Sequence, residues 1–357
     1  MHLIELTCEH FRCLNGLRFA PGPGLNVIHG DNAQGKTSIL EALFYAATSK
    51  SHRTNTESEL SQRGEPVFRV SAHVQRVARD VKIDVSWSQG AKRVKVNGVH
   101  QSRVSDLLGK IHVVLFSPED SELVRGSASS RRTFLDMELS QLHAAYLHAL
   151  QRYRNAMRQR NEILRGPQPD ETLLDVWDAQ LVEHGSVLMR ERRRFVEQLA
   201  PLANGAYRAI AGGEDMQVAY KPDVRDESNL AEALAAGRKS DLRQGQTGHG
   251  PHRDDLEFVV ADKGARQFAS QGQQKTAGLA VKLAELELMR ERTGEYPILL
   301  LDDVFAELDG PRSHRVMQAV PDSVQCLITT TDFALFASLG QRHPAVFRVR
   351  DGVLAAE

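Results

Sequence analysis

The sequence predicts an α/β protein in which both ends of the chain build one sheet-containing lobe and the middle forms an inserted, mainly helical lobe. Two observations support this prediction. Strand-like apolar segments alternate with helical segments at both ends, whereas a charged helical pattern occupies about residues 129–205. Since alternating strands and helices favour helices packed on a sheet, we expect residues 1–125 and 248–357 in the first lobe and residues 126–247 in the second.

The first lobe begins with strands over residues 1–28, followed by a glycine-rich loop at 30–37 and a helix from about residue 37 to 48. Residues 67–96 alternate apolar and polar side chains, with turn residues at 88–90 and at Asn97-Gly98. This period of two, with such turns, predicts an antiparallel β subdomain. A buried strand over 111–116 follows, and Ser117-Pro118 ends it.

In the middle of the chain, Gly166-Pro167-Gln168-Pro169 breaks the helical pattern once and predicts two antiparallel helices. Residues 211–247 show no clear period. Beyond them, the pattern predicts a helix over 271–293, buried strands over 298–301 and 324–329, and a hairpin around Asp351-Gly352.

The bulk composition excludes several classes of protein. The net charge is -1 over 357 residues, so any nucleic-acid surface must be a local patch. The three cysteines, Cys8, Cys13 and Cys326, form no CxxC pair, which argues against a disulfide framework or zinc site and is typical of the cytoplasm. No run approaches 18 apolar residues, and we therefore expect no membrane span.

Residues 30–37 read GDNAQGKT and match the pattern G-x-x-x-x-G-K-[ST] between a strand and a helix. Glycines let such a loop turn its backbone N–H groups toward phosphates, and the start of the helix adds a positive dipole end. Lys36 can reach the β- and γ-phosphates, and the Thr37 hydroxyl can bind Mg²⁺. The candidate ATP-binding residues are Gly30, Asp31, Asn32, Ala33, Gln34, Gly35, Lys36, Thr37 and Ser38. The alternative is a glycine-rich turn with an incidental lysine.

A second motif ends the apolar strand at 298–301 with Asp302 and Asp303. Acids at the carboxyl end of a buried strand lie at the ligand-binding edge of an α/β sheet. Asp302 is then a candidate Mg²⁺ ligand, and Asp303 is the candidate catalytic residue that orients or deprotonates the attacking water. Alone, the pattern is equally compatible with an ordinary strand that ends in solvated acids.

The separation of Lys36 and Asp302 by 266 residues is typical of ABC-ATPase heads, which carry a long insertion between these motifs. Ser270, Gln271, Gly272 and Gln273 open the predicted helix and resemble the ABC signature, which completes the ATP site of a partner protomer. In isolation, an ordinary helix cap would be the favoured interpretation of Ser270. Its place about 30 residues before the strand at 298–301 favours the signature instead. Asp309 lies in a segment that resembles the D-loop. Thr329-Thr330-Thr331-Asp332 stands where ABC transporters carry a switch histidine, and no Q-loop glutamine is evident.

Further motifs extend over nearly the whole chain, and together they resemble the RecF family. They are Cys8–Arg12, GDNAQGKTSILEA, Ser51–Thr54, Phe116–Glu119, Ser130–Asp136, Arg158–Asn161, Gly248–Asp255, SQGQQK and LLLDDVFAELD. The resemblance implies a head like that of SMC proteins, without a long coiled coil. It also implies ATP-dependent homodimerisation, weak DNA-dependent ATPase activity, and recombinational repair of single-strand gaps with RecO and RecR. Replication restart and SOS induction belong to the same implied function.

Residues 150–165 supply a candidate DNA surface, because this stretch contains five arginines and only one acidic residue, Glu162. These candidates are Arg152, Arg154, Arg158, Arg160 and Arg165, and arginines 190 and 192–194 form a second cluster. Such stripes bind backbone phosphates without reading sequence, although a solvated helix face shows the same pattern. His249–Asp255 is compatible with a metal site or a structural turn, and we favour the turn.

Two rival functions remain. The first is an ABC-type ATPase subunit that works on a protein or membrane partner; in a transporter it would carry a switch histidine and a shorter insertion. The second is a DNA-junction protein whose phosphate loop is a relic, in which DNA affinity would not depend on Lys36.

Overall fold

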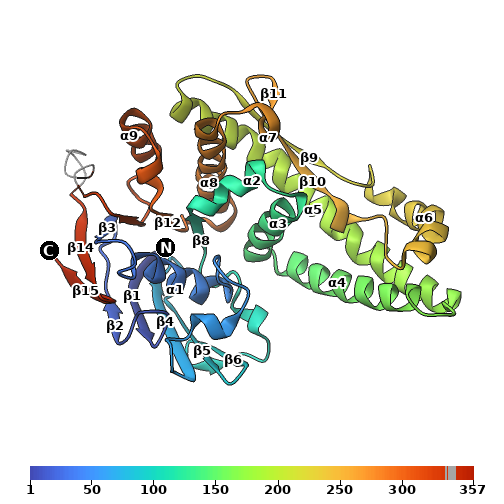
Figure 1. Cartoon of the computed structure of the whole chain (residues 1–357), viewed down its shortest axis with the longest axis horizontal. Coiled ribbons are helices and arrows are strands. Elements are labelled where there is room, and N and C mark those ends of the chain that lie inside the picture. Colours follow the sequence, from blue (N-terminus) through green and yellow to red (C-terminus); the bar gives the residue numbers. More distant parts are fainter. Residues whose placement is uncertain (334–335, 337–342) are drawn as a thin grey trace. The chain divides into compact units, whose positions relative to one another are not determined.

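A computed structural model describes residues 1–333, 336 and 343–357, which fall into two compact units (Figure 1). Unit 1 comprises residues 1–120, 209–212 and 282–357, and unit 2 comprises residues 121–208 and 213–281. The α/β class is confirmed, with both ends of the chain in unit 1. Among the described residues, no helix combines the length and the apolar character that crossing a membrane requires.

The first sheet of unit 1 has the strand order β15-β14-β3-β13-β12-β8. Its strands are Leu25–His29 (β3), Val113–Phe116 (β8), Ile298–Asp302 (β12), Cys326–Thr330 (β13), Ala345–Arg350 (β14) and Val353–Ala356 (β15). All neighbours are parallel except β14 and β15. The carboxyl ends of β3, β12 and β13 therefore meet at one edge of the sheet, where a doubly wound fold binds its ligand.

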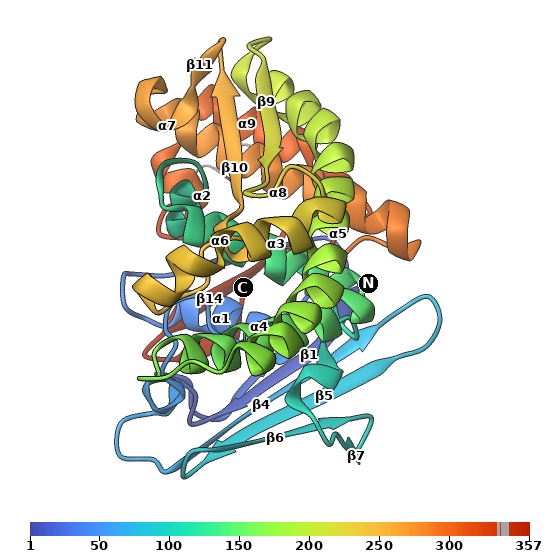
Figure 2. The same ribbon diagram turned by 90° about the vertical axis from the view of Figure 1, so that its right-hand side faces the viewer.

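The second sheet of unit 1 is antiparallel, with the order β2-β1-β4-β5-β6-β7 (Figure 2). Its strands are His2–Glu9 (β1), Leu17–Phe19 (β2), Val67–Gln75 (β4), Val81–Ser88 (β5), Ala91–Val96 (β6) and Val99–His100 (β7). The turns Gln89-Gly90 and Asn97-Gly98 have positive φ angles at both residues, as type I′ hairpins require. The predicted β subdomain is thus present, and α1 (Lys36–Thr48) packs on β4.

Unit 2 combines helices with a small sheet of order β11-β10-β9. Its elements are α2 (Ser121–Arg125), α3 (Ala128–Leu142), α4 (Ala144–Leu164), most of α5 (Glu171–Ala211), β9 (Met216–Lys221), α6 (Leu230–Gln244), β10 (Asp255–Val260), β11 (Lys263–Gly264), α7 (Ala265–Phe268) and the first half of α8 (Gln271–Thr293). Contacts of Arg160 with Asp178 and of Tyr146 with Arg192 show that α4 and α5 are antiparallel, as predicted.

The remaining described elements are α9 (Gly310–Ala319) in unit 1 and six short 3₁₀ helices. The 3₁₀ helices are Glu57–Leu60 (η1), Val104–Leu107 (η2), Pro118–Asp120 (η3), Glu227–Asn229 (η4), Pro251–Arg253 (η5) and Val304–Glu307 (η6).

Three features differ from the sequence prediction. His143, in extended conformation, separates α3 from α4, so the helical block has a second break. The stretch 211–247 contains β9 and α6. Residues 248–281, expected in the first lobe, lie in unit 2. The reason is that β10 pairs with β9 over six residues, with Asp255 opposite Lys221 at one end and Val260 opposite Met216 at the other.

Candidate functional site

The phosphate loop connects β3 to α1 at the carboxyl edge of the parallel sheet. Gly30, Ala33 and Gly35 have φ angles of 153°, 63° and 110°, so the backbone turns sharply before the helix begins at Lys36. The Lys36 Nζ donates hydrogen bonds to the carbonyl oxygens of Gly30 (2.7 Å) and Asp31 (2.8 Å). The ammonium thus lies over the loop, bonded to groups that a phosphate could replace.

The surroundings of Lys36 are both desolvated and acidic. Burial lowers the pKa of Lys36, and the carboxylates of Asp303 and Asp302 oppose this shift. Asp302 ends β12, 266 positions after Lys36 in the sequence, and Asp303 follows it directly. The structure therefore brings the two predicted nucleotide-binding motifs together.

A candidate Mg²⁺ site lies where three oxygen-bearing side chains meet. The Thr37 Oγ1 donates to Asp302 Oδ1 at 2.9 Å, and the Thr329 Oγ1 donates to the same oxygen at 2.6 Å. Asp302 is 4% exposed and ends β12. Hydroxyl and carboxylate oxygens next to a phosphate loop are the ligands that Mg²⁺ prefers, so Thr37 and Asp302 fit this ion.

Asp303 follows directly in a left-handed conformation, with φ 49°. Its backbone N–H lies 3.2 Å from the Thr329 carbonyl oxygen and 3.0 Å from the Thr329 Oγ1. Such a conformation is uncommon outside glycine and turns the chain sharply after the strand. The sequence did not assign Thr329 to this role. Its hydroxyl bridges Asp302 and Asp303, and the Thr330 hydroxyl is bonded to the backbone of Asp332.

The predicted signature lies in unit 2, at the start of α8. Ser270 and Gln273 form a reciprocal capping box: the Gln273 N–H donates to Ser270 Oγ (3.2 Å), and the Ser270 N–H donates to Gln273 Oε1 (2.9 Å). Ser270 and Gln271 are exposed, and Gly272 is half-buried. The serine is thus a helix cap, and it also leaves the positive end of a long helix accessible to an anion.

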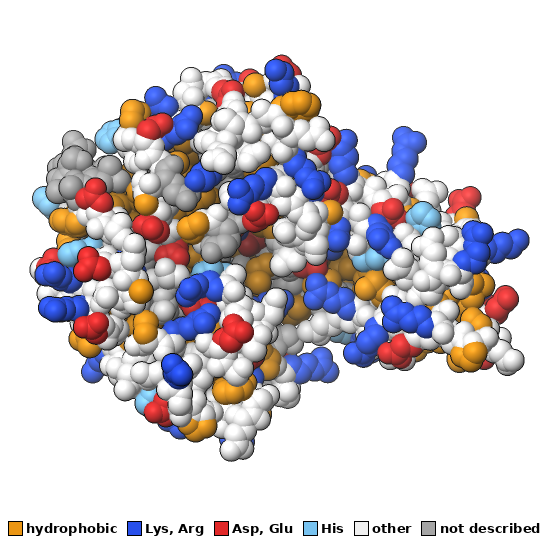
Figure 3. All heavy atoms as spheres, in the orientation of Figure 1, with side chains coloured by type: hydrophobic (Ala, Val, Ile, Leu, Met, Phe, Trp, Pro, Cys, Tyr) orange, Lys and Arg blue, Asp and Glu red, His pale blue; other side chains and the backbone are white. Residues whose placement is uncertain are grey.

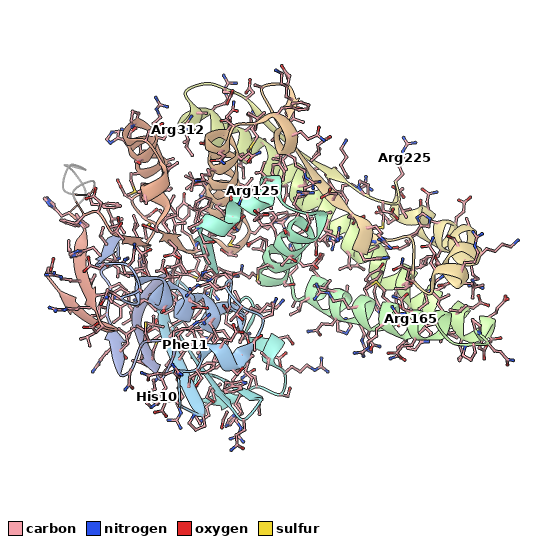
Figure 4. The ribbon with its side chains drawn as sticks, in the orientation of Figure 1. His10, Phe11, Arg125, Arg165, Arg225 and Arg312 are labelled. Atoms are coloured by element: carbon pink, nitrogen blue, oxygen red, sulfur yellow. The ribbon has the colours of Figure 1, made fainter. Side chains whose placement is uncertain are left out.

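The predicted D-loop residue Asp309 lies in unit 1, where it caps α9. Its carboxylate accepts the Arg312 N–H at 2.8 Å and remains exposed. Figure 4 labels Arg312 at the beginning of this helix.

Comparisons with known proteins decide the family. A family model described as an AAA domain matches residues 5–163. "DNA replication and repair protein RecF" of Symbiobacterium thermophilum is 42% identical over 100% of this chain and 99% of its own length. The protein of the same description from Pediococcus pentosaceus is 39% identical over 99% of this chain and 98% of its own. The chain belongs to the RecF family.

Solved structures agree with this family and with the predicted head fold. The recombination mediator protein RecF-ATP of the RecFOR pathway superimposes with a TM-score of 0.91 at 30% identity, over 100% of this chain and 97% of that chain. An SMC head bound to the C-winged helix domain of ScpA has a TM-score of 0.60 at 15% identity, covering 100% of this chain and 97% of that one. The second match concerns the fold alone.

In this RecF-family chain, the prediction that Arg160 contacts DNA is wrong. Arg160 is 0% exposed and forms ion pairs with Asp178 (2.5 Å) and Asp241 (2.7 Å). Arg192, from the second predicted cluster, is also buried and pairs with Asp136 (2.8 Å) and Asp254 (2.9 Å). Their acidic partners lie on other segments of the chain. Both guanidinium groups therefore link segments inside unit 2 and are not available to DNA.

The other predicted arginines reach the surface of unit 2. Arg152, Arg158 and Arg165 are exposed, and Figure 4 labels Arg165 just beyond the end of α4. Arg154 is 55% exposed and pairs with Asp136 at 2.8 Å. In Figure 3, Lys and Arg side chains gather over the α4, α5 and α6 part of this unit. A phosphate-contacting surface on α4 stays a prediction for four of the five arginines.

Sequence reasoning missed a second basic surface, on the β6–β7 hairpin of unit 1. Residues 91–103 contain Lys92, Arg93, Lys95 and Arg103 and no acidic residue. Arg93 and Lys95 are exposed on one face, opposite Ser86 and Asp84 of β5, and neither has an ion-pair partner among the described residues. A search for stretches without acids would have found this surface.

The segment His249–Asp255 forms a turn with a buried carboxylate at its centre. Asp254 is 0% exposed and accepts hydrogen bonds from Arg192, the Asp223 N–H and the Tyr220 hydroxyl. His252 lies between the Tyr153 hydroxyl (2.7 Å) and the Thr247 carbonyl oxygen (3.0 Å). The segment thus joins β10 to the helices of unit 2.

Proposed function

We propose that this chain is a DNA-binding protein that binds ATP with Mg²⁺, hydrolyses it weakly and dimerises on ATP, in the recombinational repair of single-strand gaps. The observation that carries this proposal is the convergence of Lys36, Thr37 and Asp302 at one edge of the sheet. The family supports it, since relatives are described as DNA replication and repair proteins and a similar structure holds ATP.

In the nucleotide-bound protein, loop N–H groups and Lys36 would hold the phosphates, with Lys36 exchanging the carbonyl oxygens of Gly30 and Asp31 for phosphate oxygens. Thr37 and Asp302 would hold Mg²⁺, which neutralises charge on the phosphates. Asp303, whose backbone N–H is bonded to Thr329, would orient or deprotonate the attacking water with its carboxylate. DNA-dependent ATPase activity therefore serves as a switch.

In the proposed dimer, the exposed start of α8 is the part of unit 2 that binds the nucleotide of the partner protomer. Ser270 and Gly272 of one protomer would close over the γ-phosphate held by its partner, with Gln271, Gln273 and the D-loop residue Asp309 nearby. Hydrolysis removes the bridging phosphate and opens the dimer. ATP would thus control DNA residence by shifting the population between closed and open forms.

DNA is the proposed partner, in the form of gapped duplex, a single-strand/double-strand junction or single strands. The exposed arginines of α4 and the basic face of β6–β7 offer sequence-independent phosphate contacts. RecO and RecR are proposed protein partners, since a matching structure is placed in the RecFOR pathway. Replication restart, SOS induction and a cytoplasmic location complete the proposal.

Light scattering with and without Mg-ATP tests this proposal. We expect the mass of the wild-type particle to double when ATP is added. Ser270→Arg should remain monomeric, because the larger, positively charged side chain blocks the start of α8. The matched control is Ser228→Arg, at an exposed serine that is remote in sequence from the phosphate loop and from the signature at Ser270. A wild-type protein that stays monomeric with saturating ATP would contradict the dimer and favour an ABC-type ATPase that acts on another protein.

A further inference from the structure

The turn of the β14–β15 hairpin lies against the phosphate loop. The Gly352 N–H donates to the Gln34 carbonyl oxygen at 3.0 Å, and the Asp351 N–H donates to Gln34 Oε1 at 2.6 Å. Gln34 is therefore held by both its main chain and its side chain. The two donors come from adjacent residues of one tight turn, at φ 50° and 76°.

The hairpin also lies close to the beginning of the loop and to the segment around Cys13. A Cβ atom on Gly30 would lie 2.4 Å from the Val349 carbonyl oxygen, and a Cβ atom on Gly352 would lie 2.2 Å from the Cys13 carbonyl oxygen. At the end of β3, the His29 Nε2 lies 2.9 Å from a carboxylate oxygen of Glu357. Both glycines are thus required by space as well as by backbone angle.

This arrangement determines which way a phosphate-binding N–H points. The Gln34 carbonyl and the Gly35 N–H belong to one planar trans peptide, so they point in opposite directions. Because the hairpin holds the carbonyl on its own side, the Gly35 N–H points away from the hairpin. Residues 31–33 of the loop are exposed, and Gln34 is the loop residue that the hairpin bonds directly.

We propose that the β14–β15 turn positions the phosphate loop for ATP, with Gln34 as the positioning residue that links the two. The inference rests on the proposed ATP binding and assigns the hairpin a part in it. A loop held in this way has its Gly35 N–H oriented before the nucleotide arrives. Loss of the contact should therefore lower the affinity for ATP even at temperatures where the variant stays folded.

Two glycine variants separate positioning from stability. Gly352→Ala and Gly98→Ala both place alanine at a positive φ, 76° and 80°, in a two-residue hairpin turn. Only the first creates a clash, because nothing lies within 4 Å of a Cβ atom on Gly98. We therefore expect a larger loss of Tm in Gly352→Ala than in Gly98→Ala. At a temperature well below both Tm values, the affinity for a fluorescent ATP analogue with Mg²⁺ should fall about tenfold or more in Gly352→Ala and stay at the wild-type value in Gly98→Ala.

Gln34→Ala provides a second test that creates no clash. It removes the acceptor for the Asp351 N–H and keeps the Gln34 carbonyl, so we expect a smaller loss of affinity, about threefold to tenfold. Combined with Gly352→Ala, the loss should be less than the product of the two, because both variants release the same contact. Should Gly352→Ala fail to fold, Gln34→Ala alone decides.

The outcomes separate this inference from the function on which it rests. Equal affinity in wild type, Gly98→Ala, Gly352→Ala and Gln34→Ala would overturn the positioning role and leave the proposed ATP binding intact. No nucleotide binding by wild type or Gly98→Ala would overturn both. Equal losses of affinity in the two glycine variants would reduce the hairpin to a stabilising element and overturn the positioning role.

Discussion

The phosphate loop of unit 1 and the arginine-rich helices of unit 2 are both rich in polar groups, but the hydrogen-bond partners of these groups differ. Lys36 is bonded to two carbonyl oxygens of its own loop, which a ligand can replace. Arg192 is 2% exposed on its side chain and is bonded to Tyr146, Asp136, Asp254 and the Pro251 carbonyl oxygen. The partners of Lys36 can thus be exchanged for a ligand, whereas the partners of Arg192 are other parts of the folded chain.

The largest expected effect concerns Asp303 in unit 1. Asp303→Asn removes the proposed base without changing size, and we expect ATP turnover to fall about 10²- to 10⁴-fold while the ATP-bound dimer accumulates. Phosphate release and light scattering measure the two quantities. Asp262→Asn, an exposed turn residue with φ 59°, is the control. Normal turnover in Asp303→Asn would remove this residue from its proposed role.

The next effect concerns the interior of unit 2. Arg192→Ala leaves the buried carboxylate of Asp254 without its cationic partner, and we expect a loss of about 3–5 kcal/mol in the free energy of unfolding. Arg190→Ala, two residues away and exposed, should change it by less than about 0.5 kcal/mol. Urea denaturation of both variants measures the difference. Equal losses would mean that burial does not distinguish these arginines.

A smaller effect separates the two basic surfaces. If Arg93 and Lys95 contact phosphates, Arg93→Ala/Lys95→Ala should reduce the slope of log K against log salt for duplex DNA by about 1.8. Arg152→Ala/Arg158→Ala makes the same test for α4, and Arg18→Ala, 79% exposed on its side chain, is the control. A slope unchanged in either double variant would exclude that surface from DNA contact.

The smallest effect is a pH dependence in unit 2. Burial lowers the pKa of His252 from its ordinary value of 6.5, so the unfolded chain binds more protons than the folded one just below pH 6.5. Stability is therefore fully present above pH 6.5 and declines as pH falls through this window. His252→Gln should flatten this part of the curve, measured as urea midpoints from pH 7 to 5. An unchanged slope would show that His252 does not titrate differently on folding.

How much could be predicted depends on whether the determining contacts are local. The hairpin at Asn97-Gly98 and the strand before Asp302 were predictable, because two-residue turns and continuous apolar runs constrain the backbone directly. β9 was missed because Met216 and Val218 are its only buried residues, which is too few to show a period. The boundary at residue 248 was misplaced for the same reason, since β10 depends on β9.

Which arginines are buried could be determined only from the structure. Arg160 resembles its exposed neighbour Arg158 in sequence, but its partner Asp241 is 81 residues away. No local pattern distinguishes these two residues, because burial depends on which segments pack together. The β6–β7 surface is the opposite case, since a stretch of 13 residues without an acid was visible in the sequence.

ATP in the phosphate loop is proposed to control DNA binding. The most direct measurement is the affinity for a gapped duplex, with and without Mg-ATP, for wild type and Lys36→Met across a salt series. We predict tighter binding with ATP in wild type, a steep salt dependence, and no ATP effect in Lys36→Met. Equal affinity with and without ATP in both proteins would contradict the account and leave a DNA-junction protein whose phosphate loop has no part in binding.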